Sequence, residues 1–252
     1  MSEPENEAKE SEKEKKKKEK KAKKQKPVRL FPANKKGYHI MRKMNFFRFL
    51  LYPWNSLFYP TKLYGHKKVG KGAYIYVGNH YSMWDIFYPA RTTREGIHFV
   101  AKESVTSAPV LRRWAVQIGA ITAMRDGSDI RTLKDAMRCL QNGEKVALFP
   151  EGTRNTVSEE EFLPFHAGAA LMAIKTKTPI IPFVSCSRPK LFKKVHVVFG
   201  EPFELTEYYD RKLSREDYEE AEQKIVQRMY EIRSAHRESL KAKKAGKKKC
   251  KS

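Results

Sequence analysis

The chain has 252 residues, and its 52 lysine and arginine residues outnumber 29 aspartate and glutamate residues, which gives a formal net charge of +23 at pH 7. Because 40% of the residues are apolar, the chain can build a core, so a wholly disordered protein is excluded, and the length fits one domain better than two. No apolar run approaches the ~20 residues of a spanning helix, and the three cysteines lack a C-x-x-C spacing, which excludes a disulfide scaffold and a zinc ribbon.

The two ends of the chain carry much of the positive charge. Residues 1–26 contain 11 lysines and 7 glutamates, and residues 233–252 contain 7 lysines, 2 arginines and 1 glutamate. We therefore expect disordered basic tails at residues 1–36 and 240–252. Such tails attract polyanions, and composition alone leaves nucleic acid, an anionic lipid surface and simple solubility open as explanations.

Residues 37–63 are rich in aromatic side chains and are predicted to form an amphipathic helical segment that associates with a membrane. The apolar positions on one helical stripe are Ile40, Met44, Phe47 and Leu51. Pro53 is expected to break the helical pattern. A basic, aromatic segment that is too short to span is typical of an interfacial anchor, and the alternative is an ordinary helix docked on the domain.

In residues 64–239, short apolar runs alternate with helical patterns, which predicts a single α/β domain with a central mixed sheet flanked by helices. Strands are expected at residues 73–79, 97–101, 119–124, 145–149, 179–185 and 195–200. Helices are expected at residues 84–92, 108–118, 129–141, 167–177 and 214–239. The last helix begins with a capping-box-like pair, Ser214 and Asp217. Its packed face is predicted to hold Tyr218, Ala221, Ile225, Met229 and Ile232.

A histidine and an aspartate follow the first of these strands. His80 and Asp85 are five residues apart, and on a regular helix such positions lie about 140° apart. We expect the two side chains to meet only if His80 lies in the strand-to-helix loop and Asp85 in the first helical turn. The carboxylate would then fix the imidazole tautomer and stabilise the imidazolium, as a general base requires. The alternative is a loop histidine with a structural role.

A second polar motif, Phe149-Pro150-Glu151-Gly152-Thr153-Arg154, follows a predicted buried strand. Gly152 beside the strand end frees backbone N–H groups to face an anion, and Arg154 is suited to bind phosphate oxygens in a bidentate manner. Arg125 ends another predicted strand. Ligands of α/β sheets gather at the carboxyl ends of strands, so these residues predict an anion site there. For either arginine, the alternative is a solvated surface charge.

Four motifs in this order resemble the glycerolipid acyltransferase family. They are Asn79-His80-x-x-x-x-Asp85, Gly119-x-Ile121-x-x-x-Arg125, Phe149-Pro150-Glu151-Gly152-Thr153-Arg154 and Ile181-Pro182. The resemblance covers about residues 64–203 and is greatest to the bacterial 1-acyl-sn-glycerol-3-phosphate acyltransferases. His166 stands where that family commonly has Lys or Arg, and Ser104 stands where it usually continues Glu-Leu.

The resemblance implies an enzyme that moves a fatty acyl chain from a thioester donor to the free hydroxyl of 1-acyl-sn-glycerol-3-phosphate (lysophosphatidate), giving phosphatidate. His80 would take the hydroxyl proton, and Asp85 would orient His80. The implied substrate-binding residues are Lys102, Arg125, Glu151, Gly152, Thr153 and Arg154. The donor would be acyl-CoA or an acyl carrier protein, and no cofactor or metal is expected.

Because both substrates carry acyl chains, the resemblance also implies a peripheral or monotopic location on the cytoplasmic face of the cell membrane, with the lipid surface as partner and no specific nucleic acid. One alternative is the same chemistry on glycerol-3-phosphate or another lysolipid. A second is a basic nucleic-acid-binding protein, which is disfavoured because no recognition motif accompanies the charge. Ser82 is a disfavoured nucleophile because it lacks a G-x-S-x-G context.

Overall fold

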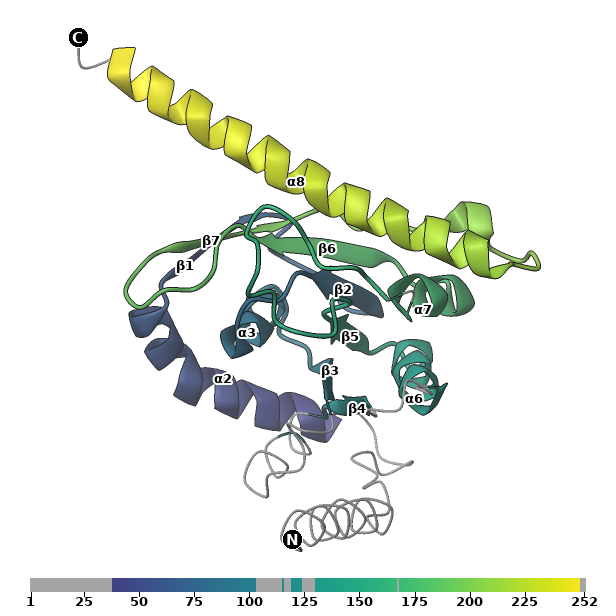
Figure 1. Cartoon of the computed structure of the whole chain (residues 1–252). Coiled ribbons are helices and arrows are strands. Elements are labelled where there is room, and N and C mark those ends of the chain that lie inside the picture. The colour runs from purple at the N-terminus through teal and green to yellow at the C-terminus, as the bar shows by residue number, and fades with distance from the viewer. Residues whose placement is uncertain (1–37, 103–114, 116–118, 124–129, 167, 250–252) are drawn as a thin grey trace, which may run out of the picture.

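The structure is a computed structural model, and it describes residues 38–102, 115, 119–123, 130–166 and 168–249. Within these residues, seven strands form one sheet in the order β1-β7-β6-β2-β5-β3-β4 (Figure 1). The strands are β1 (Thr61–Gly65), β2 (Tyr74–Gly78), β3 (Ile97–Lys102), β4 (Ile121–Ala123), β5 (Lys145–Leu148), β6 (Ile180–Ser185) and β7 (Val195–Phe199). All neighbouring strands are parallel except β6 and β7, so the predicted mixed sheet is confirmed.

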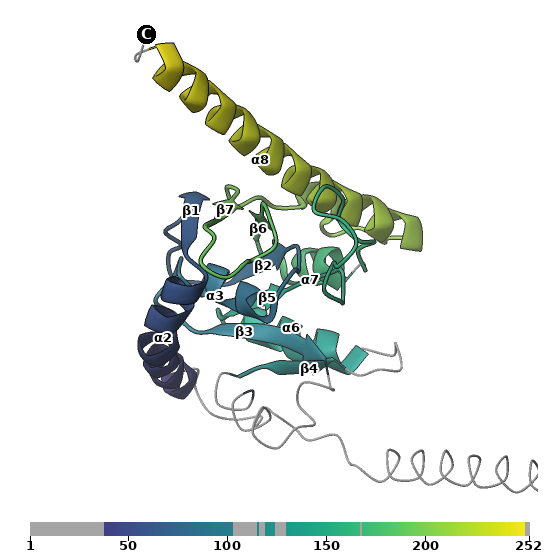
Figure 2. The ribbon, with the colours of Figure 1, turned by 60° about the vertical axis from the view of Figure 1, so that its left-hand side comes forward.

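Helices cover both faces of this sheet. They are α2 (Tyr38–Phe58), the short 3₁₀ turn η1 (Met83–Ile86), α3 (Phe87–Ala90), α6 (Ile130–Gln141), α7 (Gly168–Thr176), the 3₁₀ turn η2 (Thr206–Tyr208) and α8 (Arg215–Lys249). Figures 1 and 2 show α6, α7 and α8 on one side of the sheet, with α3 and then α2 on the other. The predicted α/β domain with a helix-flanked sheet is therefore the fold observed.

The core has two layers because successive residues of a strand point to opposite faces. On β2, Ile75 and Val77 pack with the α6–α7–α8 layer, whereas Tyr76 packs with Tyr88 of α3 on the other face. Strand β2 ends at Gly78, where the ring of Phe183 packs against the backbone. A Cβ atom on Gly78 would lie 2.2 Å from the ring of Phe183, so no larger residue fits immediately before the Asn79–His80 loop.

All six predicted strands are present, and the predicted start of α8 is confirmed by two hydrogen bonds. Ser214 N donates to Asp217 Oδ2 (2.8 Å), and Asp217 N donates to Ser214 Oγ (3.2 Å). The predicted inward face of α8 is also correct, with Ala221, Ile225 and Met229 fully buried. The capping motif and the helical period were therefore sufficient to place this helix against the sheet.

Two expectations about the ends of helices were wrong, and one strand was missed. Strand β1 was not predicted and begins at Thr61, inside the segment 37–63. Helix α2 continues through Pro53 to Phe58, and its last turn is docked on the domain, where Phe58 O accepts a hydrogen bond from Phe192 N (2.7 Å). Helix α8 does not stop at residue 239. It runs to Lys249 through residues expected to be a disordered tail, since lysine and alanine are good helix formers.

Two expectations fall outside the described residues, namely the tail at residues 1–36 and most of the helix at 108–118. Within the residues that are described, no helix has the length and apolar character needed to cross a bilayer.

A buried glutamate joins α8 to the start of α7. Glu222 is 2% exposed, and its Oε2 atom accepts a hydrogen bond from Ala170 N (3.0 Å) in the first turn of α7, where helix N–H groups have no intrahelical partner. Burial raises the pKa of Glu222 to about 7. The folded protein therefore keeps a proton on this carboxyl at a pH where the unfolded chain loses it.

Replacing Glu222 with glutamine is expected to stabilise the protein above pH 7. A raised folded-state pKa means that the wild type loses stability as pH rises from about 4.5 through 7, by up to roughly 3 kcal/mol, whereas the glutamine keeps the bond to Ala170 without titrating. Urea unfolding at pH 5 and pH 8 measures this difference. The exposed Glu238 on the same helix gives the control, Glu238→Gln. Equal pH dependence in wild type and Glu222→Gln would contradict the assignment.

Candidate active site

The polar residues singled out in the sequence lie at one edge of the sheet. Strands β2, β5 and β6 are mutually parallel, so their carboxyl ends lie at the same edge. His80 follows β2, and Glu151 follows β5. Asn79 joins the end of β2 to that of β6: its Oδ1 accepts a hydrogen bond from Ser185 N (2.8 Å), and its Nδ2 donates to Ser185 O (3.1 Å). The strand ends are thereby held in fixed register beneath the loop that carries His80.

His80 and Asp85 meet as predicted, with His80 Nδ1 3.0 Å from Asp85 Oδ2. The same Oδ2 atom accepts hydrogen bonds from Tyr81 N (2.6 Å) and Ser82 N (2.7 Å), which folds the loop back on the first turn of η1. Ser82 and Asp85 form a capping box at the start of η1. This S-x-x-D pattern was visible in the sequence and explains why residues five apart come together.

The arrangement leaves Nε2 of His80 available to accept a proton. Asp85 is fully buried, and a Nδ1–H donated to its carboxylate leaves the lone pair on Nε2. The imidazole also stacks on the ring of Phe149, with centroids 4.3 Å apart and an interplanar angle of 18°. With 20% of its side chain exposed, His80 is oriented by two partners and still open to a substrate.

Glu151 holds the backbone of this loop. Its Oε1 accepts a hydrogen bond from His80 N (2.9 Å), and its Oε2 accepts one from Leu163 N (3.1 Å). Burial raises the pKa of Glu151, and the two backbone N–H groups oppose that rise. On the other side, Asn155 N donates to His80 O (2.7 Å). Glu151 therefore shapes the site by positioning His80, without presenting a carboxylate to solvent.

Asn155 is a site residue that the sequence reasoning missed. It is 1% exposed, and its Oδ1 atom accepts hydrogen bonds from Val157 N and Ser158 N, both at 3.0 Å. Its Nδ2 donates to Glu161 O (2.8 Å). An asparagine that bonds the backbone two and three residues ahead is a common turn signal, and it follows Arg154 directly in the sequence.

The residues predicted to bind phosphate are only partly described. Gly152 has a φ of +61°, a left-handed conformation that favours glycine, and Thr153 and Arg154 after it are exposed. No ion pair of Arg154 is found within the described residues. Lys102 ends β3, beside the other strand ends, but its side chain lies outside the described part, and Arg125 lies outside it entirely. The predicted meeting of two arginines thus stays a prediction.

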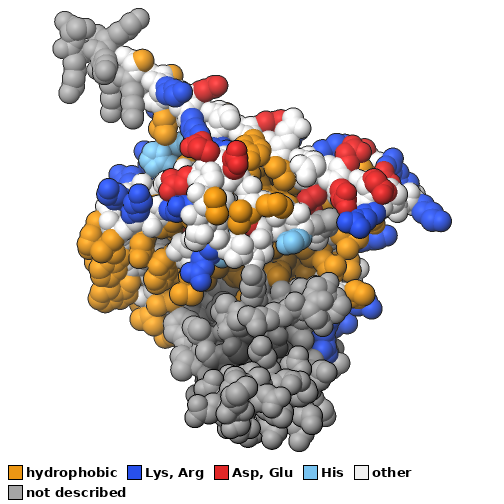
Figure 3. Space-filling view, in the orientation of Figure 1, with side chains coloured by type: hydrophobic (Ala, Val, Ile, Leu, Met, Phe, Trp, Pro, Cys, Tyr) orange, Lys and Arg blue, Asp and Glu red, His pale blue; other side chains and the backbone are white. Residues whose placement is uncertain are grey.

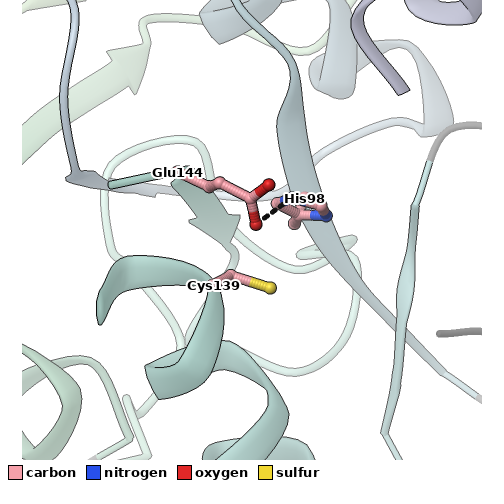
Figure 4. A group of neighbouring side chains, drawn as sticks. All are labelled: His98, Cys139 and Glu144. Atoms are coloured by element: carbon pink, nitrogen blue, oxygen red, sulfur yellow. Dashed lines mark ion pairs between the residues drawn. The ribbon is translucent and has the colours of Figure 1, made fainter. Parts of the chain in front are cut away.

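A second cluster of polar side chains lies at the opposite edge of the sheet (Figure 4). His98 Nε2 is 3.2 Å from Glu144 Oε2, and His98 Nδ1 is 2.9 Å from Gly119 O. Cys139 completes the group, with the three ligand atoms within 4.8 Å of one another. Burial raises the pKa of the Cys139 thiol to about 12. Both ring nitrogens of His98 already have partners, Glu144 and the carbonyl of Gly119. The cluster lies at the start of β3 and β5 and is thus separate from the candidate site around His80.

Comparison with protein families finds the family described as "Acyltransferase" over residues 60–186. The 1-acyl-sn-glycerol-3-phosphate acyltransferase of Saccharomyces cerevisiae is 30% identical over 166 residues, covering 65% of this chain and 51% of that protein. The Helicobacter pylori protein of the same name is 29% identical over 157 residues, covering 60% and 63%. The alignments thus span about half to under two thirds of these relatives.

Among solved structures, the 1-acyl-sn-glycerophosphate (LPA) acyltransferase PlsC from Thermotoga maritima matches with a TM-score of 0.57 and 24% sequence identity. The match covers 76% of this chain and 79% of that one. At this level of identity, the likeness shows the fold.

Proposed function

Because the chain belongs to the acyltransferase family, we propose that it transfers a fatty acyl chain from a thioester donor to the free hydroxyl of lysophosphatidate, giving phosphatidate. The observation that carries this proposal is the His80–Asp85 pair at the carboxyl edge of the sheet, joined through Glu151 to the loop that contains Arg154. The names of the yeast and Helicobacter relatives support lysophosphatidate as the acceptor.

In the proposed reaction, His80 acts as the general base. Its Nε2 takes the proton of the acceptor hydroxyl as that oxygen attacks the carbonyl carbon of the thioester. Asp85 stabilises the imidazolium that forms. The tetrahedral intermediate then expels the thiolate, which receives the proton from His80, so the products are an ester and a thiol. A thiol has a reference pKa near ~8.5 and leaves readily, so no covalent acyl-enzyme is needed.

The phosphate of the acceptor is assigned to Arg154, with Arg125 and Lys102 as further candidates. Arg154 is exposed and follows the left-handed Gly152 at the strand edge that holds His80. A guanidinium at this place can bind two phosphate oxygens at once. Because phosphate lies away from the reacting hydroxyl, Arg154 is expected to act on substrate binding more than on the chemical step.

The proposed site of action is the surface of a membrane, on its cytoplasmic face. Several apolar side chains of α2 are exposed, which suits the interfacial anchor predicted for this segment. The anchor then consists of α2, and the acyltransferase domain starts with β1 at Thr61. A location at the lipid surface gives the enzyme direct access to an acceptor and a product that both reside there.

The acceptor is tested with purified protein and a panel of lysophosphatidate, glycerol-3-phosphate and lysophosphatidylcholine, each with acyl-CoA and with acyl carrier protein as donor. We expect product from lysophosphatidate and a KM for it at least ~10-fold higher in Arg154→Ala, with a smaller change in kcat. Arg94, an exposed arginine near the start of β3 and thus at the opposite edge, gives the control Arg94→Ala. Product only from another acceptor would contradict the proposal.

A further inference from the structure

A tight turn between β6 and β7 presents two apolar side chains to solvent. Lys193 N donates a hydrogen bond to Lys190 O (3.0 Å), and the two residues between them, Leu191 and Phe192, are 55% and 63% exposed. Phe192 has a φ of +57°, a conformation that favours glycine or asparagine at the third position of a turn. The positive φ disfavours a phenylalanine at this position, and so does the exposure of its apolar ring to water. Neither the turn nor the core of the domain therefore explains why a phenylalanine is found here.

This turn, residues 190–194, is fixed to the end of α2. Phe192 N donates to Phe58 O (2.7 Å), and Val195 N donates to Pro60 O (2.8 Å). The rings of Phe58 and Phe192 are also in contact, with centroids 5.7 Å apart. The exposed Leu191 and Phe192 therefore stand on a turn that the fold holds in place from both sides.

The exposed side chains of the turn continue those of α2. Trp54 stacks on Phe58 with centroids 6.1 Å apart, so aromatic contacts run from the turn into the helix. The exposed apolar residues of α2 are Phe46 (61%), Phe49 (81%), Leu50 (46%), Trp54 (61%) and Leu57 (61%). Figure 3 shows apolar side chains gathered on the left of the molecule, where α2 lies. A joined apolar surface of this kind marks an interaction site.

The positive charge beside this apolar surface indicates which kind of partner the surface contacts. Lys190, Lys193 and Lys194 are exposed, and no acidic residue occurs between Ser187 and Gly200. Lys62 on the neighbouring strand β1 is exposed as well. Docking of a second copy through the same surface would bring these lysines together, which like charges oppose. Apolar side chains flanked by lysines match an anionic bilayer, where the apolar groups enter the headgroup region and the ammonium groups contact lipid phosphates.

The turn also lies on the edge of the sheet that holds the candidate site. It follows β6, whose carboxyl end is beside that of β2, the strand before His80. The end of α2 reaches the same place, since Tyr59 packs on Trp84 immediately before Asp85. A bilayer that contacts both the turn and α2 would thus lie against the edge at which His80 is found.

We infer that the turn at residues 190–194 is a second membrane contact, separate in sequence from α2. It inserts Leu191 and Phe192 among the lipids of an anionic bilayer and pairs its lysines with lipid phosphates. Two contacts that are far apart in the chain restrict how the domain can tilt on the bilayer, so together they orient the carboxyl edge of the sheet toward it. The inference rests on the proposed function only in taking the membrane as the place where the acceptor is met.

The test is co-sedimentation of the full chain with vesicles of equal parts phosphatidylcholine and phosphatidylglycerol, and with vesicles of phosphatidylcholine alone. The first variant, Leu191→Ser with Phe192→Asn, removes both apolar side chains and puts asparagine where a positive φ is tolerated, so the turn is retained. The second changes Lys190, Lys193 and Lys194 to Gln. Matched controls are Ile130→Ser, an exposed apolar residue on α6, and Lys134, Lys175 and Lys212 to Gln.

We expect the first variant to bind both kinds of vesicle at least ~10-fold more weakly than wild type, and the lysine variant to lose binding only to the anionic vesicles. Both controls should bind as wild type, and Phe192→Trp should bind at least as tightly. Wild-type binding by the first variant would overturn the inference. Acyl transfer between water-soluble short-chain substrates is measured in parallel. Its absence, with binding still dependent on the turn, would refute the proposed function and leave the membrane contact standing.

Discussion

Replacing His80 with alanine is expected to lower kcat for acyl transfer by ~10²- to 10⁴-fold, the usual contribution of a general base. The substitution removes the only group that the described geometry places to accept the hydroxyl proton. It keeps both backbone hydrogen bonds of residue 80, to Glu151 Oε1 and from Asn155 N, so the loop should hold its shape. KM for lysophosphatidate should change little, since the proposed reaction assigns the phosphate to Arg154.

The measurement is steady-state kinetics of phosphatidate formation, with thermal unfolding to confirm that the variant folds. His66 is a suitable control because it pairs with Glu201 (2.8 Å) away from the proposed chemistry, so His66→Ala should keep wild-type activity. Activity in His80→Ala within a few-fold of wild type would exclude the general-base role. In that case Ser82→Ala and a search for an acyl-enzyme would follow, since Ser82 carries the aliphatic hydroxyl two residues after His80.

The geometry of the candidate site could be predicted from the sequence wherever its contacts are local. His80 and Asp85 lie within one turn of chain, and the capping box at Ser82 is enough to bring them together. The start of α8 was found for the same reason, because Ser214 and Asp217 satisfy each other within three residues. Short-range hydrogen bonding of this kind depends on residue type and spacing, both of which a sequence displays.

Contacts between distant segments were not predictable in this way. The assignment of Glu151 to the substrate pocket stays a prediction, and its hydrogen bonds from His80 N, 71 residues away, and from Leu163 N were not predicted. Asn79 likewise bonds Ser185, 106 residues away. Strand β1 was missed because its five residues include a lysine and lie at the edge of the sheet, where only pairing with β7 identifies them as a strand. Each of these features depends on the packing of the whole domain.

Replacing Asp85 with asparagine is expected to lower kcat by a similar ~10²- to 10⁴-fold, although Asp85 touches no substrate in the proposed reaction. The amide keeps the size of the carboxylate, and its oxygen can still accept the hydrogen bonds from Tyr81 N and Ser82 N. It supplies no negative charge to stabilise an imidazolium. His80 Nδ1, Tyr81 N and Ser82 N all face the same oxygen of Asp85, so the amide oxygen takes that place and the ring keeps its Nδ1–H tautomer. The substitution therefore tests the charge of the carboxylate alone. Alanine is a poorer test, because it would leave two backbone N–H groups unpaired at a cost of ~1–3 kcal/mol each.

If Asp85 positions His80, a double variant should give a result that a purely structural role of Asp85 would not give. If Asp85 acts only through His80, then the double variant His80→Ala with Asp85→Asn should be no slower than His80→Ala alone, because the partner through which Asp85 works is already gone. Nitrogen NMR of the His80 ring should show the Nδ1–H tautomer in Asp85→Asn as in wild type, and the melting temperature should stay near that of wild type. Additive losses in the double variant would mean that Asp85 supports the reaction by a route that does not pass through the imidazole.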